Sequence, residues 1–257
     1  MSRHTPSAAK VPQAIYPLAA GLALLMVWQA LVTWLDVPRY LLPSPVDIAS
    51  ALGARFQDIL GDTLITLLEA VAGFTVGSTS AFFVGVIFAH FHRFERAFSP
   101  LFVALQAVPL IAIAPLLIVW MGNGYASKVT MAALICFFPM VIATAAGLSK
   151  APRDSEELMT VLNSTVWQRF LLLRLPQSVP FLMAGLKVNA SYAVIGAIVS
   201  ELAGAGRGIG YQILMASYKT DTPVLFAAIF MAAITGIGFF KVVEAFERRL
   251  AVRYGSK

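Results

Sequence analysis

Charged side chains are scarce in this sequence, and their scarcity decides the class of the protein. Only 12% of the 257 residues are Asp, Glu, Lys or Arg, against about 25% in a soluble domain. Apolar residues make up 59%, above the roughly 45–50% that is usual. A surface with so little charge must face something other than water, which excludes a soluble globular protein. The composition predicts an all-α, polytopic membrane protein.

Cysteine is nearly absent, and nucleotide-binding motifs are missing. Cys136 is the single cysteine, so an internal disulfide is excluded and the fold must be held by packing. The sequence contains no Gly-Lys pair followed by Ser or Thr, which excludes a P-loop, and another chain must bind ATP if transport uses it. The apolar stretches carry no metal-ligand or nucleophile constellation, so we expect a non-catalytic protein without a cofactor.

Long apolar stretches dominate what is present. A helix that crosses a bilayer needs roughly 20 residues, and six stretches qualify: residues 16–35, 63–89, 97–121, 128–148, 180–200 and 223–245. The segment 43–57 is too polar to span and is expected to form a short helix on the outer surface. We therefore divide the chain into residues 1–62, with the N-terminal tail, the first span and the surface helix, and a five-helix core over residues 63–257.

Basic residues collect on one side of these six spans. Of the 19 lysines and arginines, all but five lie on the side of the two termini and of the loop between the fourth and fifth spans. Because basic residues resist translocation, this asymmetry predicts that both termini and this loop are cytoplasmic. It also accounts for the net charge of +6 without a nucleic-acid partner.

Small residues recur at every fourth position on two of the expected spans, which allows another backbone to approach closely. They are Gly73, Gly77, Ala81, Gly85 and Ala89 on the second span, and Ala228, Ala232 and Gly236 on the sixth. These strips fit either helix packing within one chain or a seam between two copies.

The cytoplasmic loop, residues 150–178, contains a helix-like middle. Leu158 and Trp167 are among its apolar anchors, and Glu156 and Glu157 among its charges. An amphipathic helix offers a partner a row of anchors, and charges at its edge select partner and register. The alternative is a surface helix in the headgroup layer with Trp167 as interfacial anchor.

With its flanks, this loop resembles the "EAA" loop of permease subunits of bacterial ATP-binding-cassette importers. Glu157 matches the Glu of the motif and Leu175-Pro176 its end, while Met159 replaces an Ala and Asn163 a Gly. Asn can adopt the left-handed conformation that the Gly would supply. The resemblance implies a coupling helix on the ATPase, with contacts from Glu156, Glu157, Leu158, Asn163, Leu175 and Pro176.

Shorter motifs along nearly the whole chain are similar to the sulfonate, nitrate, taurine and pyrimidine-precursor branch of this family. They include Leu42-Pro43-Ser44-Pro45, Gln106-Ala107-Val108-Pro109, Trp120-Met121-Gly122, Phe137-Phe138-Pro139 and Ser200-Glu201-Leu202. The resemblance implies a type I importer permease in the bacterial inner membrane. Its implied partners are a second copy, two ATPase subunits and an extracytoplasmic solute-binding protein.

The resemblance also implies a substrate class. The run from Gln106 to Pro115 is most similar to permeases for thiamine pyrimidine precursors, riboflavin and related heterocycles. An alkanesulfonate, taurine or nitrate is the alternative solute. An ion-coupled secondary transporter is the alternative class, although the inverted repeats expected of one are not visible.

Polar residues at membrane depth usually face the interior of a helix bundle. We expect Gln106, Asn189, Ser191 and Tyr192 along a translocation path, with interhelical hydrogen bonding as the alternative role. Pro109 interrupts the third span, either to line that path or as a purely structural kink.

The connection after the fifth span is rich in glycine. We expect Gly208 and Gly210 to lie in a flexible, outward-facing turn and Glu201 to shape an external gate there. Glu69, in the second span, is expected to pair within the bundle.

Overall fold

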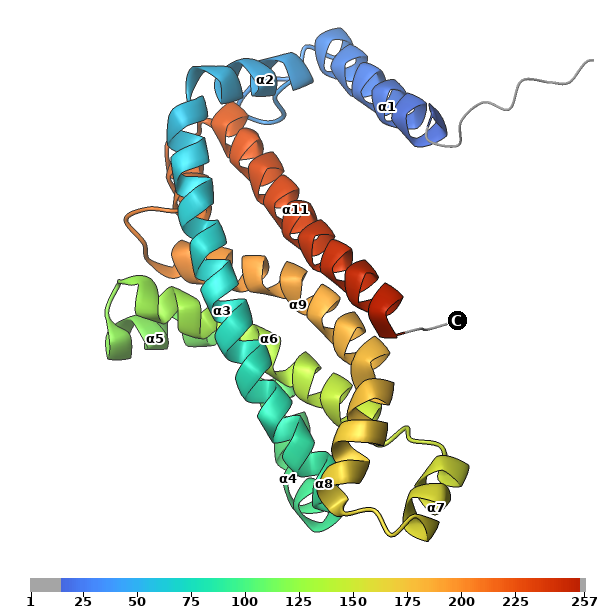
Figure 1. The fold of residues 1–257 in the computed structure, drawn as a ribbon. Coiled ribbons are helices and arrows are strands. Elements are labelled where there is room, and N and C mark those ends of the chain that lie inside the picture. The colour runs from blue at the N-terminus through green and yellow to red at the C-terminus, as the bar shows by residue number, and fades with distance from the viewer. Residues whose placement is uncertain (1–14, 255–257) are drawn as a thin grey trace, which may run out of the picture.

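The computed structural model describes residues 15–254, and their regular structure is entirely helical (Figure 1). Five helices in this part are long and apolar enough to cross a bilayer: α1 (Ile15–Trp34), α3 (Phe56–His90), α6 (Tyr125–Leu148), α9 (Leu175–Ala203) and α11 (Thr222–Tyr254). The shorter helices are α2 (Pro45–Ala54), α4 (His92–Ala107), α5 (Ala114–Met121), α7 (Arg153–Val161), α8 (Val166–Arg169) and α10 (Ile209–Tyr218).

Helix α2 is the short helix expected over residues 43–57. Ser44 caps it: its hydroxyl accepts from the backbone of Asp47, whose carboxylate accepts from the backbone of Ser44. Such a capping box satisfies two backbone donors at a helix start. The hydrogen bond from the Ser44 side chain also holds the pKa of Asp47 below its ordinary value.

Close packing of α3 and α6 forms the centre of the bundle. A Cβ atom added to Gly77 would overlap the backbone of Ala133, and one added to Gly85 would meet the side chain of Thr144. The glycine strip of α3 therefore packs within the chain, where absent side chains let two backbones approach. Gly236 on α11 has open space around it instead.

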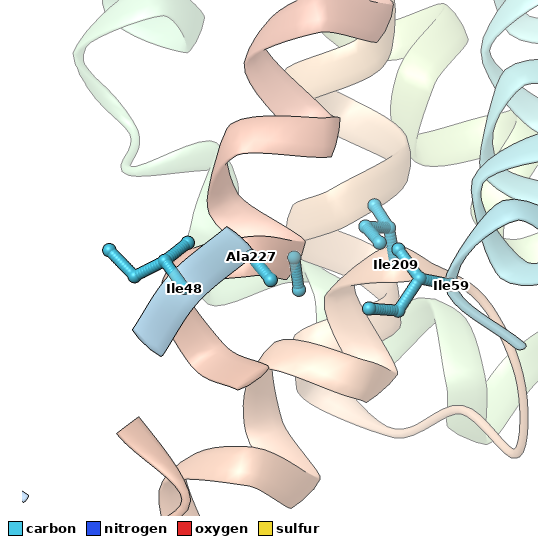
Figure 2. Close-up of a cluster of buried hydrophobic side chains, with 5 residues drawn as sticks. Ile48, Ile59, Ile209 and Ala227 are labelled. Carbon is cyan, nitrogen blue, oxygen red and sulfur yellow. The ribbon is translucent and has the colours of Figure 1, made fainter. Parts of the chain in front are cut away.

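A second core joins the short helices to the bundle. Ile48 of α2, Ile59 of α3, Ile209 of α10 and Ala227 of α11 form one buried cluster (Figure 2). These residues come from two pairs of consecutive helices at opposite ends of the sequence, so apolar burial at this point fixes α2 and α10 against the ends of α3 and α11.

The expected third span over residues 97–121 is wrong as a single helix. α4 ends before Val108, which is extended at φ −71° and ψ 126°, and a single 3₁₀ turn, η1 (Leu110–Ile113), follows. Pro109 is the cause, because proline has no N–H donor and disfavours helical geometry in the residue before it. Pro115 stands in the first turn of α5, where proline is tolerated.

Helix α1 packs little against the rest of the chain. Trp28 packs on α11, with its ring 6.0 Å from that of Phe226 and 6.5 Å from that of Phe230. Most other side chains of α1 are exposed, as is typical of a helix that faces lipid or another subunit.

Candidate functional site

Helix α7 lies at the far end of the bundle from α2 (Figure 1). Asp154 and Glu156 stand in its first turn, where negative charge stabilises the positive end of the helix dipole. Asn163 ends it in the left-handed conformation, with φ 53°. The amide of Ser164 donates to the carbonyl of Met159, and that of Asn163 to Thr160, both at 3.0 Å. These two bonds form a Schellman motif, so the left-handed turn expected at Asn163 is present.

Most apolar side chains at the end of α7, including that of Leu162 just after it, are exposed. Leu158 is 59% exposed, Val161 83% and Leu162 66%. Glu157, next to them, is also exposed. Trp167 of α8 adds a further exposed ring at 66%. The helix thus presents an apolar ridge with a carboxylate at its edge, which is the pattern of a helix that docks into a groove.

The two neighbouring glutamates of α7 have different surroundings. Glu156 accepts a hydrogen bond from Arg174 Nε at 2.7 Å, in an ion pair that is only partly exposed. This pair joins α7 to the π-helical turn η2 (Phe170–Arg174), which leads into α9. Glu156 therefore holds α7 to the bundle, whereas Glu157 is exposed. Leu175 and Pro176 form the half-buried start of α9.

Asn189 lies between helices rather than in an open path. It is fully buried, and its Nδ2 donates to Ser78 Oγ at 3.0 Å and to the carbonyl oxygen of Cys136 at 2.8 Å. These two bonds are interhelical hydrogen bonds, the alternative role that the sequence left open for Asn189. Ser191 is half-buried, and Tyr192 is 40% exposed.

The other two path residues belong to the segment around the end of α4. Gln106 falls in the last turn of α4, and Pro109 is exposed at the break after that helix. Beside this break is an apolar groove of about 550 Å³, lined by Phe102, Phe138 and other apolar side chains of α3, α4 and α6.

The glycine-rich connection is exposed at Gly206 and Arg207 but packed at its end. Gly208 and Gly210 are buried, and a Cβ atom on either would overlap the carboxyl group of Glu201. Glu201 is itself fully buried and accepts from the amide of Gly210 at 2.6 Å and from Thr66 Oγ1 at 2.6 Å. An exposed position for Gly208 and Gly210 themselves is wrong, because the amides at the start of α10 need acceptors, and buried side-chain oxygens supply them.

Two residues of α3 complete this arrangement. Asp62 Oδ1 accepts from the amide of Gly208 at 3.1 Å, and Thr66 Oγ1 accepts from that of Ile209 at 2.8 Å. Asp62 and Thr66 lie four positions apart, on one face of α3. Sequence reasoning missed both, although a polar pair at that spacing in an apolar helix was the available signal.

A comparison with known families decides the class. Residues 77–253 match the family described as the inner membrane component of binding-protein-dependent transport systems. The match covers more than half of the sequence. This chain is a member of that family.

Individual relatives support the assignment over nearly the full length of the permease. This chain is 34% identical over 233 residues to the riboflavin transport system permease protein RibX of Chloroflexus aurantiacus, and the alignment covers 88% of this chain and 85% of that protein. This chain is 34% identical over 243 residues to the formylaminopyrimidine transport permease protein ThiX of Halalkalibacterium halodurans, and the alignment covers 93% of this chain and 95% of that protein. The putative aliphatic sulfonates transport permease protein SsuC of Bacillus subtilis is 29% identical over 229 residues, covering 88% and 83%.

Family membership gives the permease a role as the membrane subunit of an ATP-binding-cassette importer rather than an enzyme. The family also implies two kinds of partner, an ATPase and a solute-binding protein. The predicted family, its helical membrane fold and its transport role are confirmed.

Proposed function

We propose that α7 is the coupling helix, which docks on the cytoplasmic ATPase. The observation that carries this is the exposed apolar ridge of Leu158, Val161 and Leu162 beside Glu157. The hydrophobic effect favours burial of such a ridge against a partner. Glu157 sets the register on the ATPase, while Glu156 and Arg174 transmit its movement to α9.

The complete importer contains two copies of the permease, two ATPase subunits and an extracytoplasmic solute-binding protein, in the bacterial inner membrane. Both termini and α7 are cytoplasmic, as the basic residues favour. The broken segment from α4 to α5 makes the sixth crossing. ATP binding closes the ATPase pair, and the helices alternate between inward- and outward-facing states.

The solute is a heterocyclic vitamin or vitamin precursor. Two relatives with names that specify riboflavin and formylaminopyrimidine share 34% of aligned residues with this chain, and the relative named for aliphatic sulfonates shares 29%. An alkanesulfonate, taurine or nitrate is the second candidate, which the sulfonate relative supports. On the outer side, Glu201, Gly208 and Gly210 form the gate, and Gln106, Pro109, Ser191 and Tyr192 line the path, with Asn189 holding α9 in place.

Charge reversal in α7 tests the coupling role. Glu157→Lys places a like charge against the basic groove expected on the ATPase, and such juxtaposition costs several kcal/mol. Each 1.4 kcal/mol corresponds to about tenfold in affinity, so the purified variant should lose its ATPase subunits and substrate-stimulated hydrolysis. Asp58→Lys is the matched control, since Asp58 is exposed at the other end of the bundle, at the start of α3. Wild-type hydrolysis and assembly in Glu157→Lys would refute the coupling role.

A further inference from the structure

A single π-helical turn joins the loop that carries α7 to α9. In this turn, η2, the amide of Leu175 donates to the carbonyl oxygen of Phe170, five positions earlier. An α-helix would pair that amide with the carbonyl four positions earlier, that of Leu171. The helices on both sides, α8 and α9, are α-helical. Isolated π turns are rare and are frequent at functional sites, so η2 needs a physical cause and a use.

The packing around η2 shows an extra residue independently of this hydrogen bond. Phe170, Leu173, Ser178 and Leu182 are buried, at steps of three, five and four positions. Steps of three or four keep side chains on one face of an α-helix, and a step of five does not. Phe170 packs against α3, where its ring lies 5.3 Å from that of His90. One residue is therefore inserted between the buried face of η2 and that of α9.

Pro176 explains where the insertion lies. Proline has no N–H donor, and in a regular α-helix its ring collides with the carbonyl group four positions earlier. For Pro176 this is the carbonyl group of Leu172, which lies inside η2. A wider turn at Leu172 moves this carbonyl group away from the ring, and prolines and π turns are both recognised causes of helix bending.

We propose that Pro176 is a positioning residue, which holds η2 in the π form and thereby sets the direction of α7 relative to α9. The inference rests on the proposed function, in which α7 docks on the ATPase. It gives Pro176 a role through η2 rather than through a contact with the partner.

The rotation that Pro176 prevents is large. Each residue turns an α-helix by about 100°. If η2 became α-helical with the extra residue in place, α8 and the loop with α7 would rotate by about this angle relative to α9. A point on the backbone of α8, about 2.3 Å from the helix axis, would move by about 3.5 Å. α7 is a separate helix outside this radius (Figure 1), so it would move farther, and Glu156 would lose its ion pair with Arg174.

Three variants separate the effect of the proline from that of the inserted residue. Pro176→Ala keeps the inserted residue without the proline, so η2 should become α-helical and α7 should rotate. Deletion of Pro176 removes both together, and the buried positions then follow at regular steps of three and four, so α7 should keep its direction. Pro180→Ala is the matched control, because Pro180 stands in the α-helical part of α9.

Distances between spin labels measure the direction of α7. Thr160→Cys on α7 is paired in turn with Arg93→Cys on α4 and with Ala245→Cys on α11, all at exposed positions, in a Cys136→Ala chain. The full-length permease is placed in lipid nanodiscs, and labelled chains are diluted with unlabelled chains so that both labels of a pair belong to one copy. Two reference helices are used because a rotation can leave one distance unchanged.

Pro176→Ala should shift at least one of the two distances by about 3.5 Å or more. Pro180→Ala and the deletion of Pro176 should keep both distances at their wild-type values. Wild-type distances in Pro176→Ala would overturn the proposal, as would a shift of similar size in Pro180→Ala or in the deletion variant. If the deletion variant does not fold, the comparison of the two substitutions still decides.

ATP hydrolysis by the purified complex separates this inference from the coupling role of α7. Pro176→Ala should lower substrate-stimulated hydrolysis relative to Pro180→Ala. Shifted distances with wild-type hydrolysis would uphold the action of Pro176 on α7 and refute the coupling role. Lost hydrolysis with wild-type distances would overturn the inference alone.

Discussion

The contact between α3 and α6 gives the sharpest prediction of stability. Gly77→Ala adds one methyl group, which would lie 2.8 Å from Ala133 Cα and 2.9 Å from its carbonyl carbon. Ordinary contacts begin at 3.4 Å. Because the neighbours are backbone atoms, no side chain can turn away to make room. The two helices must separate, and overpacking of this kind typically costs about 1–3 kcal/mol.

Gly61→Ala in the same helix is the matched control. Gly61 has no atom within 4 Å of the position that a Cβ would take. Each substitution gains the helix propensity of alanine, about 1 kcal/mol over glycine. Since this gain is common to both variants, the difference between them isolates the contact with Ala133.

The assay is unfolding of the detergent-purified permease by sodium dodecyl sulfate, followed by far-ultraviolet circular dichroism and gel mobility. Gly61→Ala should be at least as stable as the wild type. Gly77→Ala should be less stable than Gly61→Ala by about 1–3 kcal/mol. Equal unfolding midpoints for the two variants would refute the close approach of α3 and α6 at this point.

Three further predictions concern coupling, topology and solute. Asn163→Gly should keep substrate-stimulated ATP hydrolysis, and Asn163→Val should reduce it. The reason is that a left-handed residue other than glycine costs about 1–2 kcal/mol, and β-branching adds to the strain. Similar rates of hydrolysis in the two variants would contradict the role of this turn in coupling. The topology is tested with single cysteines placed in a Cys136→Ala chain. Cysteines at Ser2 and Ser256, which lie outside the described residues, should be shielded from an impermeant thiol reagent in intact cells, while a cysteine at Ser217 should react. The reverse pattern of labelling would overturn the proposed orientation. A strain without this permease should lose uptake of a labelled heterocyclic vitamin or precursor yet still use taurine and alkanesulfonates as sulfur sources, and the opposite phenotype would favour the sulfonate alternative.

Local chemistry made several features predictable from the sequence. Apolar length alone indicated helices at α1, α3, α6, α9 and α11. The Ser44-Pro45 start of α2 and the left-handed end of α7 at Asn163 could also be expected. These features depend on neighbouring residues only, since caps and turns are formed by hydrogen bonds within a few positions.

The exposed ridge of α7 was partly predictable. Its anchors and charges could be named from the helical spacing, but the different surroundings of Glu156 and Glu157 could not. The pairing of Glu156 with Arg174 spans 18 positions and depends on how the loop folds back on the start of α9.

The sequence by itself determined that this protein is a helical membrane protein, because composition and apolar length are properties of the chain alone, and its short motifs carried the resemblance to importer permeases. Only the tertiary structure decided the surroundings of its polar residues. Thr66 meets Glu201 across 135 positions, and Asn189 meets Ser78 across 111. A buried polar group must find a partner wherever packing brings one, and no periodicity in the sequence specifies which helix supplies it.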